Sequence, residues 1–196
     1  DRAGLVGADG PTHHGVLDIA YLRCIQDIVV MSPKDESELR DMLYTAIACK
    51  GGPVALRYPR GNGLGIPMKT GFDIVPIGKA ETVRAGKDVA ILALGNMVHQ
   101  SVKAAELLSK DGIEAEVVNM RFVKPVDEAM IADICGRFRN VLTVEDHVVD
   151  GGFGSVVLEA IQRTGIRSPR VRLHGIPGAF IEHGRPAELY AMLKLD

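Results

Sequence analysis

The chain has 196 residues, of which 46% are hydrophobic, and a formal net charge of -2. Its length predicts one large or two small globular domains, and its lack of excess Lys and Arg argues against a nucleic-acid partner. No apolar run approaches the roughly 20 residues that a bilayer crossing needs, so we expect no membrane partner and a cytoplasmic protein, or a plastid one if the source is a plant. Because the chain begins at Asp1 in a glycine-rich loop rather than with Met, we expect a fragment of a longer protein.

The first part of the chain predicts two strands with a helix between them. Runs of β-branched and apolar residues predict strands at 28–31 and 54–58. Ser32 and Pro33 predict the start of the helix, because Ser is a good N-cap and Pro suits the first helical position. Apolar residues three and four positions apart predict its buried face: Leu39, Met42, Leu43, Ala46 and Ile47.

Residues 59–67 are too rich in Gly and Pro for regular structure, and they predict a linker. Strands and helices then alternate to the end of the chain. We expect strands at 79–84, 89–94, 115–119, 141–144 and 170–173, and helices at 98–109, 127–138, 152–163 and after Pro186. This alternation predicts an α/β fold of mainly parallel sheets covered by helices, with right-handed crossovers.

The loop at residues 9–15 holds a carboxylate and two imidazoles within seven residues. Asp9 and His13 stand four positions apart in a loop stiffened by Pro11, which suits proton transfer or hydroxyl binding. A metal site is the weaker interpretation, because the adjacent side chains of His13 and His14 should diverge and no fourth ligand is evident. A polar surface turn, in which Asp9 bonds to the backbone, remains an alternative.

Two arginines are candidates for binding an anion. Arg60 follows a predicted strand in the run 57–61, and Arg2 precedes Ala-Gly at the start of the chain. A guanidinium binds phosphate or carboxylate through a fork of N–H groups, and neighbouring glycines let a ligand approach. Solvated or salt-bridged surface arginines are the alternative.

Other polar groups and thiols receive a structural interpretation or stay open. The run 151–155 lacks the lysine and full glycine order of a phosphate-binding loop, so it favours tight packing of a helix on a strand. The triplet 145–147 stays ambiguous, and His174 and His183 are expected to be structural or solvated. The three cysteines, Cys24, Cys49 and Cys135, predict buried thiols rather than a disulfide framework or a zinc site.

Together these segments indicate a protein family far more specifically than any one of them does. The runs DRAGLVGADGPTHHG, YLRC, SPKDESELRDMLYTA, ALRYPRGNG, NMRFVKPVDE and VEDHVVDGGFGS make the chain resemble the C-terminal portion of the transketolase-like thiamine diphosphate enzymes. DRAG together with RYPRG points to the branch that makes 1-deoxy-D-xylulose 5-phosphate. The resemblance implies the C-terminal half of a pyrimidine-binding domain at 1–67, a linker at 68–77 and a transketolase C-terminal domain at 78–196.

The resemblance also implies the roles of the candidate residues. Asp9 and His13 would be catalytic, contacting substrate hydroxyl or carbonyl groups and assisting proton transfer, while Arg2 and Arg60 would bind the phosphate of D-glyceraldehyde 3-phosphate. The implied enzyme is a homodimeric carboligase that decarboxylates pyruvate and joins its two-carbon unit to that aldehyde, supplying isoprenoid, thiamine and pyridoxal synthesis.

Thiamine diphosphate and Mg²⁺ would be the cofactors of that enzyme. The residues that hold them in the family would lie upstream of Asp1, so we expect this chain alone to bind no cofactor and no metal and to be inactive. A transketolase, a β subunit of a 2-oxoacid dehydrogenase and a non-catalytic α/β assembly module remain alternatives.

Overall fold

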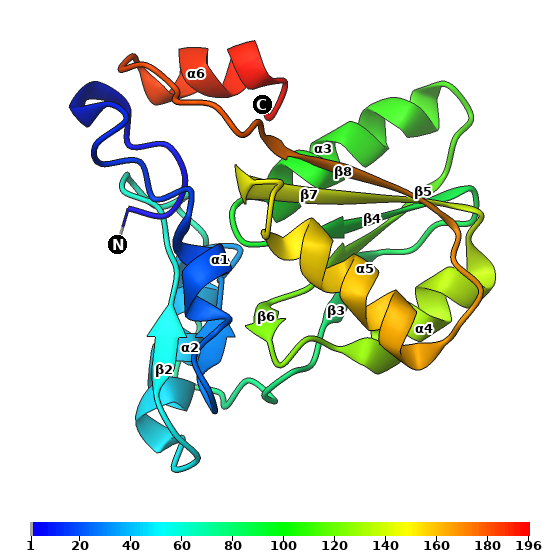
Figure 1. Ribbon diagram of the computed structural model, residues 1–196, viewed down its shortest axis with the longest axis horizontal. Helices are drawn as coiled ribbons and strands as arrows, with labels where there is room; N and C mark the ends of the chain where they lie inside the picture. The colour runs from blue at the N-terminus through cyan, green and yellow to red at the C-terminus, as the bar shows by residue number, and fades with distance from the viewer. Residues whose placement is uncertain (1) are drawn as a thin grey trace.

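The computed structural model describes residues 2–196, which form two β-sheets flanked by helices (Figure 1). The strands are β1 (Val29–Met31), β2 (Val54–Leu56), β3 (Glu81–Arg84), β4 (Val89–Ala93), β5 (Ala115–Asn119), β6 (Phe122–Lys124), β7 (Asn140–Val148) and β8 (Arg170–Ile176). The helices are a 3-10 turn η1 (Gly7–Asp9), α1 (Asp18–Leu22), α2 (Glu36–Ala48), α3 (Met97–Lys110), α4 (Glu128–Arg137), α5 (Phe153–Thr164) and α6 (Pro186–Leu193).

The sheets are mainly parallel, as the sequence predicted. The smaller sheet has the strand order β2-β1-β6 and the larger one the order β3-β5-β4-β7-β8. The pairs of β1 with β2, β4 with β5, β4 with β7, and β7 with β8 are parallel. Strands β3 and β6 pair antiparallel with β5 and β1. The expected α/β fold class is therefore confirmed.

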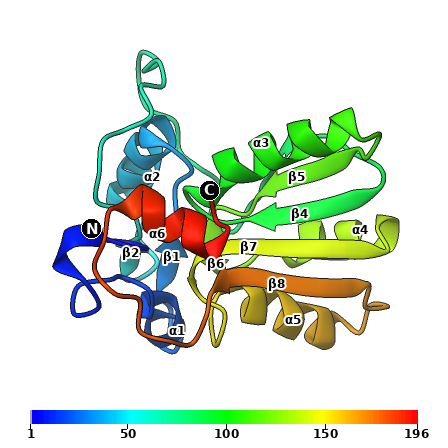
Figure 2. The same cartoon turned by 90° about the horizontal axis from the view of Figure 1, so that it is seen from above.

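The larger sheet is covered on both faces. Figure 2 shows α3 on one side of it and α5 on the other. Neighbouring strand residues point to opposite faces. Accordingly, Ile91 and Val117 belong to the apolar cluster that contains residues of α3, whereas Leu92 and Val118 belong to the cluster formed with α4 and α5. Each face thus has its own buried core.

Helix α2 differs from its prediction in both its start and its buried face. It begins at Glu36, and its N-cap is Asp35, whose side chain accepts a hydrogen bond of 2.8 Å from the Glu38 nitrogen. The predicted apolar face is wrong in part, because Leu43 and Ile47 are 54% and 78% exposed. The buried residues of the helix are Glu38, Asp41, Met42 and Thr45.

The reason for this rotation is a buried polar cluster that periodicity cannot reveal. The carboxylate of Glu38 accepts hydrogen bonds from the side chains of Lys34, Asn119 and Arg121 at 2.7–3.3 Å. Burial would raise the pKa of Glu38, but Lys34, Arg121 and Asn119 outweigh it and hold this pKa below its usual value. The helix therefore turns a charged residue inward, where its charge is satisfied.

Strand β6 connects the two sheets. It follows β5 along the chain, yet it pairs with β1 of the smaller sheet, with Met31 opposite Phe122. Between β2 and β3, residues 57–80 form no helix or strand, and an isolated bridge joins Pro59 to Ala3. The irregular structure predicted for 59–67 is confirmed, whereas the strands predicted at 54–58 and 79–84 are each two residues shorter at this segment. Neither β6 nor α1 was expected from the sequence.

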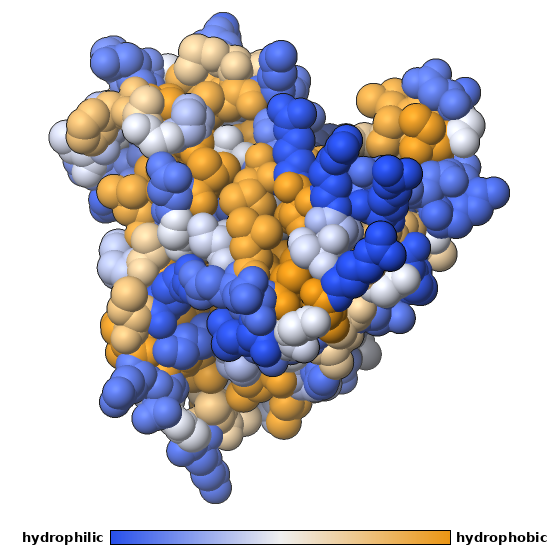
Figure 3. Space-filling model, turned by 45° about the vertical axis from the view of Figure 1, so that its right-hand side comes forward, coloured by the Kyte–Doolittle hydropathy of each residue, from blue (hydrophilic) through white to orange (hydrophobic). Residues whose placement is uncertain are grey.

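The face that Figure 3 brings forward, on the side of the larger sheet, mixes hydrophilic and hydrophobic residues. Within residues 2–196, none of the helices is long and apolar enough to span a bilayer. The prediction of buried thiols is confirmed for Cys135 but is wrong for Cys24, which is exposed, and for Cys49, which is half-buried.

Candidate active site

The loop that carries Asp9 and His13 is closed at its base by two glycines. Gly4 and Gly15 exchange reciprocal backbone hydrogen bonds, each 2.9 Å long. A Cβ on Gly15 would lie 1.8 Å from the Arg2 carbonyl oxygen, and Gly4 adopts a positive φ of 73°. Glycine is therefore required at both positions, because a side chain would force the base of the loop apart.

The loop lies where the carboxyl ends of strands from both sheets meet. The Ala3 nitrogen donates to the Tyr58 oxygen at 2.9 Å, just beyond β2, and the Val148 nitrogen at the end of β7 donates to the Val16 oxygen at 3.0 Å. Open α/β sheets bind their ligands beyond the carboxyl ends of their strands. The candidate loop has this position relative to both sheets.

The two adjacent histidines diverge, as expected. Nδ1 of His14 accepts from the Val6 nitrogen at 3.1 Å, so its Nε2 is the nitrogen that donates to the Ile181 oxygen, also at 3.1 Å. His13 is exposed, and its Nδ1 lies 2.9 Å from the Thr12 hydroxyl. Thus His14 shapes the loop, and the Nε2 of His13 stays available for proton transfer.

Asp9 and Arg60 come together across 51 positions of sequence. Nη1 of Arg60 forms an ion pair with Oδ2 of Asp9, and the two side chains are 59% and 40% exposed. The backbone next to Arg2 is joined to the same segment, because Ala3 bridges Pro59. The structure therefore brings together the segments of Arg2, Asp9, His13 and Arg60.

Arg57 has a different position from Arg60, although both belong to the run that suggested anion binding. Its side chain is 2% exposed; Nε donates to Oδ2 of Asp18 at 2.8 Å, and Nη1 contacts Oδ1 of Asp146. Burial would lower the pKa of Arg57, but the carboxylates of Asp146 and Asp18 outweigh it and raise this pKa. Arg57 is a buried, permanently charged group and has no surface for a substrate phosphate.

The glycine-rich run at the start of α5 is filled by a carboxylate of the chain itself. Glu145 accepts hydrogen bonds from the backbone nitrogens of Phe153 and Gly154 at 2.6 and 2.8 Å. A Cβ on Gly152 would lie 2.2 Å from Oε2 of Glu145. The preferred interpretation, tight packing of helix on strand, is confirmed. Burial raises the pKa of Glu145 to about 7, although the two backbone N–H groups and Arg57 oppose the shift.

Three further histidines have structural or solvated positions. His147 is buried, its Nε2 accepts from the Ile19 nitrogen at 3.1 Å, and burial together with the charge of Arg57 lowers its pKa. His174 lies 2.8 Å from the Lys194 oxygen, and the His183 side chain is 75% exposed. The expectations for His174 and His183 are thus confirmed.

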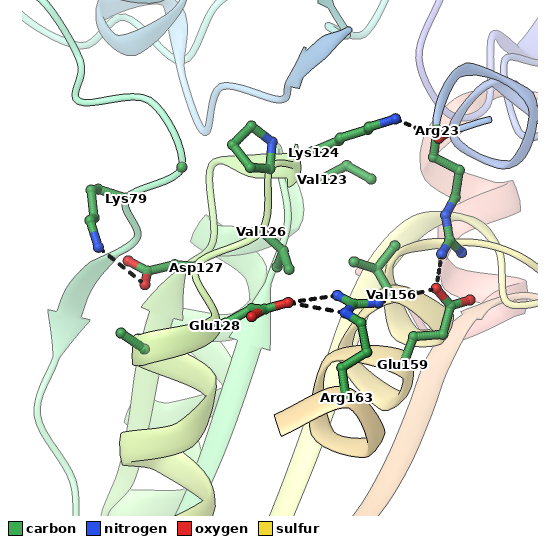
Figure 4. Close-up of a pocket in the computed structure, with 13 residues that line it drawn as sticks. Arg23, Lys79, Val123, Lys124, Val126, Asp127, Glu128, Val156, Glu159 and Arg163 are labelled. Carbon is green, nitrogen blue, oxygen red and sulfur yellow. Dashed lines mark hydrogen bonds and ion pairs between the residues drawn. The ribbon is translucent and has the colours of Figure 1, made fainter. Parts of the chain in front are cut away.

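A cavity of about 540 Å³ lies apart from the candidate loop, between β6, α4 and α5 (Figure 4). Opposite charges around it are already paired: Arg163 with Glu128 at 2.8 Å, Lys79 with Asp127 at 3.6 Å, and Arg23 with Glu159. Among residues 2–196, no group of three or more His, Cys, Asp or Glu side chains could hold a metal ion.

Comparisons with known proteins agree with this architecture. Residues 78–196 match the model of the transketolase C-terminal domain, and residues 1–64 match that of the transketolase pyrimidine binding domain. Among solved structures, a split-gene transketolase described as an inactive β4 tetramer superposes with a TM-score of 0.84 at 30% identity, over 96% of this chain and 60% of that one. A Pichia stipitis transketolase, 22% identical, shares the fold with a TM-score of 0.74 over 99% of this chain and 27% of its own.

Among curated proteins, the chain is similar to 1-deoxy-D-xylulose-5-phosphate synthases. It is 52% identical to that of Microcystis aeruginosa and 53% identical to that of Aquifex aeolicus, over all of this chain and 31% of each relative. It thus spans about a third of the length of these relatives. The resemblance drawn from the sequence motifs is confirmed, and the chain belongs to the transketolase family.

Proposed function

We propose that the protein carrying this chain is a 1-deoxy-D-xylulose-5-phosphate synthase. It decarboxylates pyruvate and condenses the two-carbon unit with D-glyceraldehyde 3-phosphate. The observation that carries the proposal is the contact between Asp9 and Arg60, which sets a cation for the acceptor phosphate beside the loop of candidate catalytic residues. Identity of about half over the whole chain with synthases of this name supports the same activity.

In this proposal the exposed residues of the site have different roles, which depend on their distance from the reacting atoms. Arg60 and Arg2 bind the phosphate, because a guanidinium forms charge-assisted and often bidentate hydrogen bonds with it. His13 transfers a proton through Nε2, since Thr12 engages Nδ1. Asp9 releases Arg60 to the incoming phosphate and accepts a hydrogen bond from a substrate hydroxyl.

We propose that the described residues do not by themselves form the cofactor site. The glycine-rich start of α5 already holds the Glu145 carboxylate, and residues 2–196 contain no cluster for a metal ion. Thiamine diphosphate would supply the carbanion chemistry of this family. We propose that the residues holding it and Mg²⁺ lie in the two thirds of the relatives that this chain does not cover.

This function implies further properties of the enzyme. We propose that the enzyme is a cytoplasmic homodimer and that Mg²⁺ accompanies its thiamine diphosphate. We also propose a domain division at 1–67 and 78–196 with a linker at 68–77, in agreement with the residues that match the two family models.

The experiment is a coupled assay of the full-length protein with thiamine diphosphate and Mg²⁺. We expect carbon dioxide release from pyruvate and formation of 1-deoxy-D-xylulose 5-phosphate when D-glyceraldehyde 3-phosphate is present. Transfer from a ketose phosphate donor, without use of pyruvate, would make the protein a transketolase. Acyl transfer to lipoamide would make it a 2-oxoacid dehydrogenase subunit. Absence of turnover with any of these donors would favour the non-catalytic assembly module.

A further inference from the structure

We propose that Arg57, fixed by Asp146 of the larger sheet, is a positioning residue that holds the loop of Asp9 and His13 in place. The identity of that loop as the substrate loop rests on the proposed function. The inference that Arg57 holds the loop rests only on the observed contacts of Arg57. Arg57 follows β2 and Asp146 lies within β7, so their ion pair connects the two sheets directly beneath the loop.

The guanidinium of Arg57 is engaged at each of its nitrogens. Nε donates to Asp18 at 2.8 Å, Nη1 contacts Oδ1 of Asp146, and Nη2 donates both to the Asp146 oxygen at 3.0 Å and to the Gly15 oxygen at 3.1 Å. A planar fork with five donors can serve these acceptors at once, which an ammonium cannot do with the same geometry. The orientation of the guanidinium is therefore fixed by carboxylates on both sides.

The loop is attached to Arg57 through its base. The Gly15 oxygen accepts from Arg57 and also from the Gly4 nitrogen, which closes the loop. Asp146 lies against Gly4 on the other side of the loop base, since a Cβ on Gly4 would lie 2.4 Å from its Oδ2 and 2.7 Å from the Tyr190 hydroxyl. Loss of the guanidinium would thus remove one of the two donors to the Gly15 oxygen and leave the carboxylate of Asp146 buried against Gly4.

Arg57 also sets the position of the anion-binding arginine. Arg60 follows it by three residues, and the intervening Tyr58 and Pro59 pair with Ala3 at the start of the loop. The buried arginine anchors the segment, and the exposed one pairs with Asp9. The two arginines of this short run therefore have different roles: Arg57 positions the segment from inside the protein, and Arg60 lies at the site.

Arg121 provides a matched control. It also joins the two parts of the chain, since Nε donates to Glu38 of α2 at 2.7 Å and Nη2 to Glu81 of β3 at 2.8 Å. Its side chain is 18% exposed. None of its hydrogen bonds reaches residues 2–15, so a variant of Arg121 weakens the junction between the sheets without touching the loop.

The test compares Arg57→Met and Arg57→Lys with Arg121→Met and Arg121→Lys in the full-length protein. Hydrogen exchange at the amides of Gly4 and Gly15, measured without substrate, reports the loop directly. We expect the Arg57 variants to exchange at least about tenfold faster there, because the guanidinium that donates to the Gly15 oxygen is lost. The Arg121 variants should change these rates by less than about twofold. Equal rates in the two sets would overturn the proposal.

Kinetics give the second readout. For Arg57→Lys we expect kcat/KM for D-glyceraldehyde 3-phosphate to fall by about tenfold or more, since misplacement of a binding group by about 1 Å is costly, and Arg121→Lys should stay within about twofold. Equal losses in Arg57→Lys and Arg121→Lys would show a merely structural role. If Arg57→Met does not fold, Arg57→Lys decides, because it retains a positive charge between Asp18 and Asp146. A wild-type protein without carboligase activity would refute the proposed function, while hydrogen exchange would still decide the role of Arg57.

Discussion

Arg60 and Asp9 form an ion pair between an arginine beyond β2 and a carboxylate in the N-terminal loop. Each is a half-exposed group, so the pair itself adds little to stability. In the proposed function its significance is chemical, because a phosphate bound by Arg60 would replace the carboxylate and leave Asp9 beside the substrate. Binding would then involve the two residues together.

The first prediction concerns selectivity for the phosphorylated acceptor. In the full-length enzyme, Arg60→Ala should chiefly raise KM for D-glyceraldehyde 3-phosphate and leave KM for pyruvate nearly unchanged. The preference for this aldehyde over unphosphorylated D-glyceraldehyde should fall by about tenfold or more, since a charge-assisted contact is lost. Steady-state kinetics with each substrate varied provide the measurement. Arg163→Ala, which removes an exposed arginine paired with Glu128, is the control. An equal rise in both KM values would contradict the assigned role.

The second prediction concerns proton transfer. His13→Ala should reduce kcat by a factor on the order of 100, the usual contribution of a general acid or base. His183→Ala removes another exposed histidine and should leave kcat unchanged. Circular dichroism of both variants checks that the fold is retained. Wild-type turnover in His13→Ala would show that the loop histidine only lines the site.

The third prediction tests the space around Gly4. Gly4 and Gly112 both have positive φ, 73° and 78°, but an added Cβ at Gly112 has no atom within 4 Å. Gly112→Ala should cost about 1 kcal/mol of unfolding free energy through backbone strain. Gly4→Ala should cost about 2 kcal/mol more, because its Cβ overlaps Asp146 and Tyr190. Urea unfolding of the two variants measures the difference, and equal losses would show that the contacts at Gly4 relax freely.

The fourth prediction concerns pH. The pKa of Glu145 is raised from 4.5 to about 7, so the folded state retains a proton that the unfolded state releases between these values. Glu145 therefore makes the free energy of unfolding fall as pH rises through this window, by about 3 kcal/mol. His147, with its lowered pKa, acts in the opposite sense as pH rises toward 6.5.

Replacement of Glu145 isolates its share of this pH dependence. The difference in unfolding free energy between wild type and Glu145→Gln should shift against the wild type from pH 4.5 to pH 8, because Gln does not ionise. Arg57 and Asp146, the charged groups that act on Glu145, are present in both proteins. Chemical unfolding at several pH values provides the data. A difference that does not change with pH would mean that folding leaves the pKa of Glu145 unshifted.

The fifth prediction concerns the cofactor. The isolated 196-residue chain should bind no thiamine diphosphate, since Glu145 fills its glycine-rich helix start. Calorimetric titration in the presence of Mg²⁺ is the measurement. Micromolar binding would overturn this prediction.

The regular elements of the larger sheet were predictable because local pattern determines them. Strands β4 and β5 alternate between two apolar faces, and Asp127 precedes α4 as its N-cap, with a side chain that accepts from the Met130 nitrogen. The candidate loop was predictable for a similar reason, since its glycines and Pro11 lie within one short run. Those features depend on residues close together in sequence.

The features that sequence patterns did not predict depend on partners far away in sequence. The buried face of α2 is decided by Glu38, whose partners Asn119 and Arg121 lie 81 and 83 positions later. The interior position of Arg57 is decided by Asp18 and Asp146, at separations of 39 and 89 positions. An arginine next to a strand gives no local sign of which direction it will face.

Strand β6 governs when the N-terminal sheet can be completed during synthesis. Met31 faces Phe122, so β1 has β2 as a neighbour early and gains its other neighbour once residues 122–124 have left the ribosome. Until then the edge of β1 that pairs with β6 lacks this partner, and unpaired backbone groups at a strand edge can pair with other chains. After completion, a protease that cuts between β2 and β3 leaves the two pieces joined through β1 and β6.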